Sequence, residues 1–131
     1  STARSNLAAG GTQTAGLAFG GNAPAITAAT EEYGGTSWTG GGAMNTARRN
    51  LAGRGTQTAG IAFGGQTPTT TTATETYDGS SWSVAAAMAI ATSGHMGSGT
   101  TSLAIAAGGN SATNVTQELT VADITKTLTT S

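Results

Sequence analysis

The chain repeats itself with a period of 44 residues, and this repeat restricts the possible folds more than any other feature of the sequence. When residues 1–44 are placed over residues 45–88, 27 of the 44 positions are identical. A fixed period of this length indicates an architecture of stacked units, because a single unit cannot bury its own apolar faces. The sequence therefore predicts a repeat protein.

A third and more divergent unit follows at residues 89–131. It keeps a glycine pair where the first two units have one, and the three pairs are Gly20-Gly21, Gly64-Gly65 and Gly108-Gly109. After a deletion of two residues, Thr116–Leu119 matches Thr74–Tyr77. We therefore divide the chain into unit one (1–44), unit two (45–88) and unit three (89–131).

Each unit is predicted to fold into four short strands. In unit two the candidates are Asn50–Gly53, Ala59–Phe63, Thr70–Tyr77 and Ser81–Val84. Ala59–Phe63 is a short apolar run of the length expected for a buried strand, and Thr70–Tyr77 is rich in β-branched residues. Asp78-Gly79 is a strong turn signal. Four strands in a unit of this length are typical of a propeller blade.

A helix over Val84–Thr92 is the alternative at the end of unit two, because Ala and Met favour helices. The equivalent stretch of unit one is Gly40–Met44, which is too rich in glycine to hold a helix. The sequence therefore favours an irregular link between units and an all-β fold.

The composition excludes several classes of function. The chain has no Cys, so it forms no disulfide and no thiolate metal site. Its formal net charge is −1 and only 8% of its residues are charged, which is not the footprint of a nucleic-acid-binding protein. No apolar run is long enough for a transmembrane helix. Since neither an initiator Met nor a signal peptide is present, we expect a processed, excised or engineered chain.

The spacing of the glycine pairs, aromatic residues and Met–Arg positions in the units resembles the kelch repeat. In that family a glycine pair ends the second strand, a Tyr precedes a turn, a Trp lies in the fourth strand, and a Met and an Arg lead into the next blade. The matching residues here, besides the glycine pairs, are Tyr33, Tyr77, Trp38, Trp82, Met44 with Arg48, and Met88 followed by Thr92. The resemblance covers the whole chain and is strong over residues 1–88. The Gly/Ala/Thr-rich composition also resembles that of kelch-like repeats in marine bacteriophage structural proteins. This resemblance implies that the protein is located on a virion or another extracellular surface.

This resemblance implies a β-propeller with three four-stranded blades per chain. The residues expected to pack the blades are Phe19, Phe63, Tyr33, Tyr77, Trp38 and Trp82. Unit three lacks these anchors, with Ala107 and Leu119 at the Phe and Tyr positions. Propellers typically need four to eight blades, so we expect a homodimer that closes a six-bladed ring. The alternative is a fragment of a larger propeller.

Several charged residues are candidates for chemistry or binding. Glutamates recur at the third strand (Glu31, Glu32, Glu75 and Glu118), and paired carboxylates are the machinery of glycosidases. Their recurrence favours structural pairs with the repeated Arg4 and Arg48, because the fork of Arg matches a carboxylate. The cluster of Arg48, Arg49 and Arg54 is a candidate for binding an anion or a sugar acid. His95 replaces Leu7 and Leu51 of the other units, and it is expected near a strand.

The sequence therefore predicts a non-catalytic propeller that serves as a structural or binding module. We expect no catalytic or metal-binding residues, no cofactor, and no nucleic-acid or membrane partner. The expected partners are a second copy of the chain and a protein or a glycan, with Arg48, Arg49, Arg54 and His95 as candidate binding residues. A self-assembling scaffold without a ligand, engineered or truncated, is the alternative, and a glycosidase-like enzyme is the third reading.

Overall fold

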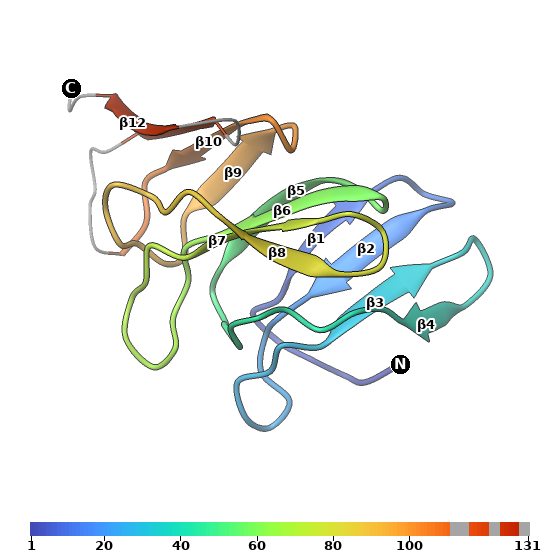
Figure 1. Ribbon diagram of the computed structural model, residues 1–131. Helices are drawn as coiled ribbons and strands as arrows, with labels where there is room; N and C mark the ends of the chain where they lie inside the picture. The colour runs from blue at the N-terminus through green and yellow to red at the C-terminus, as the bar shows by residue number, and fades with distance from the viewer. Residues whose placement is uncertain (111–115, 121–123, 129–131) are drawn as a thin grey trace.

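The computed structural model describes residues 1–110, 116–120 and 124–128, and every regular element in this part is a β-strand. The strands form three separate four-stranded antiparallel sheets, one per unit, as Figure 1 shows. The predicted all-β class is therefore confirmed. Residues 86–92 are irregular, so the helical alternative for Val84–Thr92 is wrong. The described part contains no helix of the length and apolarity that crossing a bilayer requires.

In each sheet the strands lie in the order in which they occur along the chain. Unit one forms β1 (Ala8–Gly11), β2 (Gly16–Phe19), β3 (Thr30–Tyr33) and β4 (Trp38–Gly40). Unit two forms β5 (Ala52–Thr56), β6 (Ala59–Phe63), β7 (Thr74–Tyr77) and β8 (Trp82–Ala85). Unit three forms β9 (Met96–Gly99), β10 (Leu103–Ala107), β11 (Thr116–Thr120) and β12 (Ile124–Leu128). All four strands of each sheet thus come from a single unit.

The three sheets also share one register. The first hairpin pairs Ala8 with Phe19 in unit one, Ala52 with Phe63 in unit two, and Met96 with Ala107 in unit three. The hairpin register is therefore kept in unit three although its Phe is lost. Turn geometry and the inward-outward alternation of side chains fix register more strongly than any single anchor.

Three of the four strands predicted for unit two have different bounds in the structure, and two of them, β5 and β8, lie further toward the C-terminus than predicted. Ala59–Phe63 is found as predicted, whereas Thr70–Tyr77 shortens to β7. The first residues of that stretch make other hydrogen bonds: the Thr71 amide donates to the Gly65 carbonyl in the preceding loop, and the Ala73 amide donates to Thr71 Oγ1. A β-branched composition does not reveal such competing hydrogen bonds, because they depend on where the glycine pair places its carbonyls.

The first strands of the three sheets lie next to one another, with β5 between β1 and β9 (Figure 1). From this common side the sheets stack face on face. One apolar cluster fills the space between units one and two, with Leu17, Phe19, Tyr77 and Trp82 among its members. A second cluster, with Ile61, Phe63 and Leu119, lies between units two and three. The core of the molecule is thus made of contacts between units, as expected for a repeat protein.

Candidate functional site

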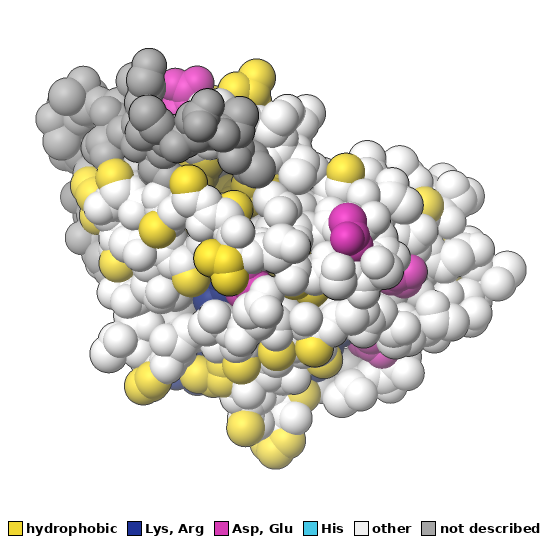
Figure 2. Space-filling view, viewed as in Figure 1, with side chains coloured by type: hydrophobic (Ala, Val, Ile, Leu, Met, Phe, Trp, Pro, Cys, Tyr) yellow, Lys and Arg dark blue, Asp and Glu magenta, His cyan; other side chains and the backbone are white. Residues whose placement is uncertain are grey.

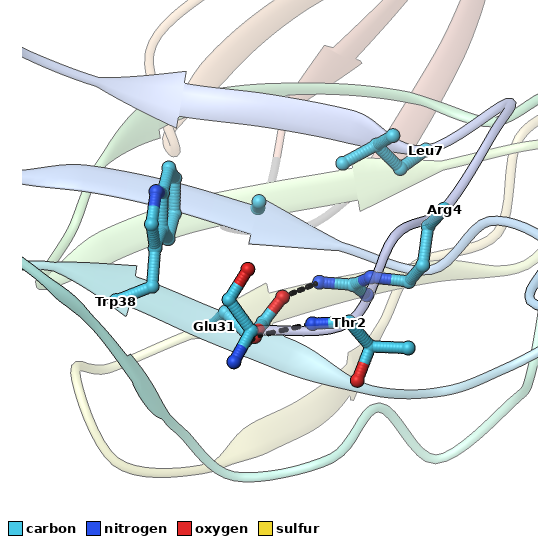
Figure 3. Close-up of a pocket in the computed structure, with 7 residues that line it drawn as sticks. Thr2, Arg4, Leu7, Glu31 and Trp38 are labelled. Atoms are coloured by element: carbon cyan, nitrogen blue, oxygen red, sulfur yellow. Dashed lines mark hydrogen bonds and ion pairs between the residues drawn. The ribbon is translucent and has the colours of Figure 1, made fainter.

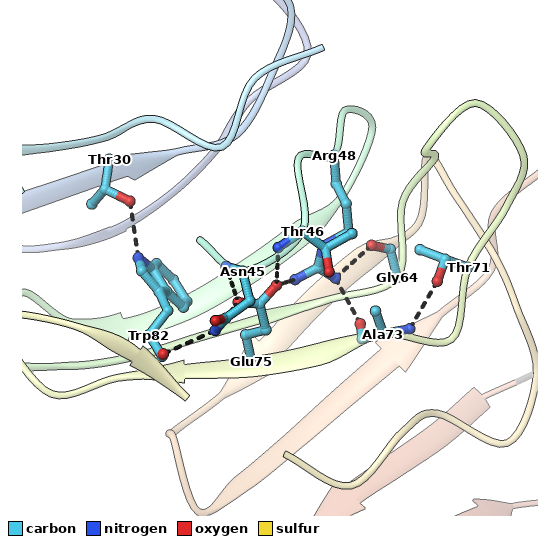
Figure 4. A network of polar contacts seen from close by, with 9 residues as sticks. All are labelled: Thr30, Asn45, Thr46, Arg48, Gly64, Thr71, Ala73, Glu75 and Trp82. Carbon is cyan, nitrogen blue, oxygen red and sulfur yellow. Dashed lines mark hydrogen bonds and ion pairs between the residues drawn. The ribbon is translucent and has the colours of Figure 1, made fainter. Parts of the chain in front are cut away.

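A buried ion pair is the centre of the best-connected polar network (Figure 4). Arg48 Nη2 lies 3.0 Å from Glu75 Oε1, and the side chains are 0% and 1% exposed. Arg48 Nη1 donates to the carbonyls of Gly64 (2.9 Å) and Ala73 (2.6 Å). Glu75 Oε2 accepts from the Asn45 amide at 2.7 Å. Burial lowers the pKa of Arg48, while Glu75 opposes that shift. The predicted Arg–Glu pairing is therefore confirmed, and this guanidinium faces no solvent.

Unit one repeats this network, and unit three replaces it by a neutral one. Arg4 Nη2 lies 2.7 Å from Glu31 Oε2. In unit three the Thr92 hydroxyl takes the place of the guanidinium and donates to the Gly108 carbonyl at 3.3 Å. Gln117, at the position of Glu75, bonds the backbone of the link through both atoms of its amide group. In every unit, therefore, the segment that precedes the first strand, which we call the link, is held by hydrogen bonds to the third strand of that same unit.

Contacts between units one and two define two faces, which we name by direction along the chain. The forward face of unit one presents Leu17, Phe19, Thr30 and Glu32 to the next unit. The rear face of unit two receives them with Gly53, Gly60, Tyr77 and Trp82. Repetition assigns the equivalent residues of the other units to their own forward and rear faces.

Two hydrogen bonds join these faces. The Tyr77 hydroxyl donates to Glu32 Oε1 at 2.5 Å, and Trp82 Nε1 donates to Thr30 Oγ1 at 2.9 Å. Burial, followed by the Glu32 carboxylate, raises the pKa of Tyr77 to about 12. The Trp82 ring lies edge-on to Phe19 with 4.8 Å between ring centroids. Glu32 is thus occupied by a contact between units, and Glu31 and Glu75 are held in ion pairs.

No other unit covers the rear face of unit one in the part of the chain that the structure describes. Trp38 is 40% exposed although the equivalent Trp82 is 6% exposed. Tyr33 is half-buried, packs at 5.2 Å from Trp38, and donates its hydroxyl to the Gly35 carbonyl. A cavity of about 170 Å³ opens here beside Trp38, Leu7 and the Arg4–Glu31 pair (Figure 3). Within the chain, Phe19, Phe63, Tyr77 and Trp82 therefore pack the units, whereas Tyr33 and Trp38 face outward.

His95 lies between units two and three, where it is largely buried and borders an open pocket of about 230 Å³. Its ring is 7% exposed, with its centroid 5.5 Å from that of Phe63. A Cβ at Gly64 would lie 2.5 Å from His95 Cε1, so this glycine makes room for the ring. Neither ring nitrogen makes a hydrogen bond of good geometry to a described residue. Burial lowers the pKa of His95, with a smaller opposing effect from the Phe63 backbone.

Replacement of His95 by Leu, the residue of the other two units, is expected to stabilise the protein. The gain is about 1 kcal/mol at pH 7, because an unpaired polar ring leaves a buried site. The folded pKa of His95 is below the unfolded value of about 6.5, so the unfolded state binds more protons in acid. Wild-type stability should therefore fall as pH drops through 6.5, and His95→Leu should flatten that fall. Urea titrations between about pH 7.5 and 5.5 measure it, and equal slopes for both proteins would contradict the assignment.

The three arginines of the predicted cluster differ in burial and in their contacts. Arg48 is buried, as described above. Arg49 is half-buried, and its Nε has no hydrogen-bond partner among the described residues. Arg54 is exposed at β5, and its Nε donates to the Gly97 carbonyl at 2.5 Å. It lines a pocket of about 380 Å³ at the ends of the first strands, together with Gly10, Gly11, Gly55, Thr56, Ala59, Gly99, Thr100 and Thr101.

Charged side chains are also sparse on the surface, as Figure 2 shows for one face of the molecule. Asp78 is one of the exposed acids, and it accepts hydrogen bonds from the amides of Ser81 and Ser80. These two bonds and the serine hydroxyls lower the pKa of Asp78 to about 2. Asp78 therefore closes a turn, as the sequence predicted. The described residues contain no group of three or more His, Asp or Glu side chains placed to hold a metal ion.

Comparison with protein-family models gave no match for this chain, and comparison with curated proteins gave none either.

Proposed function

We propose that this chain is a non-catalytic β-propeller module with kelch-like blades, and that two copies close a six-bladed ring. The observation that carries the proposal is the repetition of one stacking arrangement. Both internal interfaces place an aromatic ring of one unit over a glycine of the next, Phe19 over Gly53 and Phe63 over Gly97. Three sheets stacked in this way leave one open face at each end, and a ring needs at least one further blade.

The role proposed for the ring is recognition or structural support and not catalysis. The carboxylates with a repeated position serve the fold: Glu31 and Glu75 hold arginines, and Glu32 accepts from Tyr77. The pocket beside Arg54 lies where the first strands of all three units end. In a closed ring, two such pockets would face each other around the axis. A protein loop or a glycan with an acidic group would match this site in charge and shape.

Native mass spectrometry of the purified chain tests the ring, and the expected result is a dimer. Dilution should show monomer and dimer without species of three copies. A monomer at all concentrations would overturn the proposed ring and would favour a piece of a larger propeller. A glycan array probed with the dimer, with Arg54→Ala as the matched control, then separates a binding module from a scaffold that binds no ligand. The resemblance to phage structural proteins proposes a virion surface as the place of action.

A further inference from the structure

Among the described residues, those of the open faces lack the contacts between units that their equivalents make at the internal interfaces. At both internal interfaces a side chain of the rear face fills the space above the first glycine of a pair. A Cβ at Gly20 would lie 3.0 Å from Leu51 Cδ2, and one at Gly64 would lie 2.5 Å from His95 Cε1. At the equivalent Gly108 of unit three, no atom of the described residues lies within 4 Å of such a Cβ. Leu7, the residue of unit one equivalent to Leu51 and His95, is 37% exposed.

The ring-over-glycine contact is also altered at both open faces at once. A Cβ added to Gly53 would overlap the Phe19 ring, and one added to Gly97 would lie 2.6 Å from Phe63 Cζ. At the ends, unit three has Ala107 in place of the Phe, and unit one has Ala9 in place of the Gly. The large residue is lost on one face and the small residue gains a methyl group on the other. The two changes are opposite in direction, and the added methyl group fills part of the space that the lost ring leaves.

The polar contacts show the same pairing. Glu32 and Tyr77 bond each other between units one and two, whereas Thr76 and Leu119 occupy these positions between units two and three. The acceptor and the donor are therefore lost together within the chain. At the open ends both are present, as Glu118 on unit three and Tyr33 on unit one.

A second polar pair follows this pattern. Trp82 donates to Thr30 between units one and two. Thr74, the residue of unit two equivalent to Thr30, is buried, and its hydroxyl has no hydrogen-bond partner among the described residues. At the open ends the equivalent hydroxyl and indole are both present again, as Thr116 and Trp38.

We propose that the forward face of unit three receives the rear face of unit one from a second copy, and that it does so with these residues in register. The inference rests on the proposed ring and deepens it, because it names the contacts that close it. Across the closing interface Leu7 covers Gly108, Ala9 meets Ala107, and Trp38 donates to Thr116. The Tyr33 hydroxyl exchanges its bond to the Gly35 carbonyl for one to Glu118. Ile105, 44% exposed while its equivalents Leu17 and Ile61 are 0% exposed, is covered in the same step.

A second copy is the occupant that fits, because the open faces repeat the internal interface instead of forming a new surface. An unrelated partner would have to reproduce an acceptor, a donor and a complementary size at three separate positions. The contact is head-to-tail, and it occurs twice in a ring of two chains. Head-to-tail contacts form closed rings only if the rotation per copy closes, and otherwise they form open filaments.

A change of size tests the register of this interface. Ala107→Phe places a ring where Ala9 has its methyl group, so the dissociation constant of the dimer should rise at least tenfold. Ala9→Gly added to Ala107→Phe recreates the internal Phe–Gly pair and should restore the wild-type constant to within about threefold. These factors correspond to about 1.4 kcal/mol per tenfold change. Sedimentation equilibrium measures the constants, and circular dichroism checks that both variants fold.

The outcomes separate this inference from the proposed ring. A wild-type chain that stays monomeric overturns both. A wild-type dimer that Ala107→Phe does not weaken, or that Ala9→Gly does not rescue, overturns the register and leaves the ring intact. Filaments or larger rings with the same rescue support the contacts and overturn closure by two copies. Acrylamide quenching adds a direct readout: since Trp82 is already buried, dilution of the dimer should expose Trp38 alone.

Discussion

Arg48→Ala is expected to lower the free energy of unfolding by about 3–5 kcal/mol, because it leaves the Glu75 carboxylate buried without its partner. The loss should be large because this guanidinium also donates to the carbonyls of Gly64 and Ala73, and after the substitution the Ala73 carbonyl keeps only the Gly64 amide as a donor. Urea denaturation followed by circular dichroism measures the change. Arg54→Ala is the matched control, since that side chain is exposed, and it should cost less than about 1 kcal/mol.

Unit three supplies the rescue for this experiment. It fastens its link with Thr92 and Gln117 and uses no charge. The double variant Arg48→Thr with Glu75→Gln copies that solution and should be more stable than Arg48→Ala by at least about 1 kcal/mol. If Arg48→Ala cost no more than Arg54→Ala, the ion pair would not be part of what holds the link to its sheet.

Trp82→Ala should destabilise the fold by about 3–5 kcal/mol, the range typical of a fully buried large aromatic side chain. Its ring contacts Phe19, and its ring centroid lies 5.0 Å from that of Tyr77. Its indole nitrogen donates a hydrogen bond to the Thr30 hydroxyl. Trp38→Ala is the control at the equivalent position of unit one. Under conditions where the chain is monomeric, it should cost less than about 2 kcal/mol, because it removes half-exposed surface.

The comparison between these two tryptophans is best made by thermal and urea unfolding at several protein concentrations. Trp82→Ala should show its loss at every concentration, since it acts within one chain. Trp38→Ala should show a loss that grows with concentration, since its partner is proposed to be a second copy. Equal losses at high dilution would mean that Trp38 contributes to the fold of unit one alone.

Much of the fold could be predicted because the repeat requires three stretches of sequence to form the same four-stranded sheet. Ala59–Phe63 was placed correctly, and the Arg–Glu pairing followed from the recurrence of both residue types at one spacing. The start of β7 could not be placed, because the Thr71 amide bonds to a loop carbonyl that the sequence does not locate, and the Ala73 amide bonds to the Thr71 side chain.

The candidate site was harder to predict for a related reason. Trp38 and Trp82 occupy identical positions in their units, yet one is exposed and the other is buried, because burial depends on the neighbouring unit. His95 was expected near a strand, and its partner Gly64 could be named only once the stacking of the units was known. The clustering of Arg48, Arg49 and Arg54 in sequence gave no sign that the first of them is buried.

The fastening of each link to its own sheet bears on how such a chain can change in length. None of the described strands is shared between units, so a break in the link near Asn45 or Ala89 leaves the three sheets whole. Gene duplication or loss can then add or remove one unit at a time without the rebuilding of any sheet. For the same reason, two copies assembled as proposed would exchange with others by separating at their faces, without unfolding.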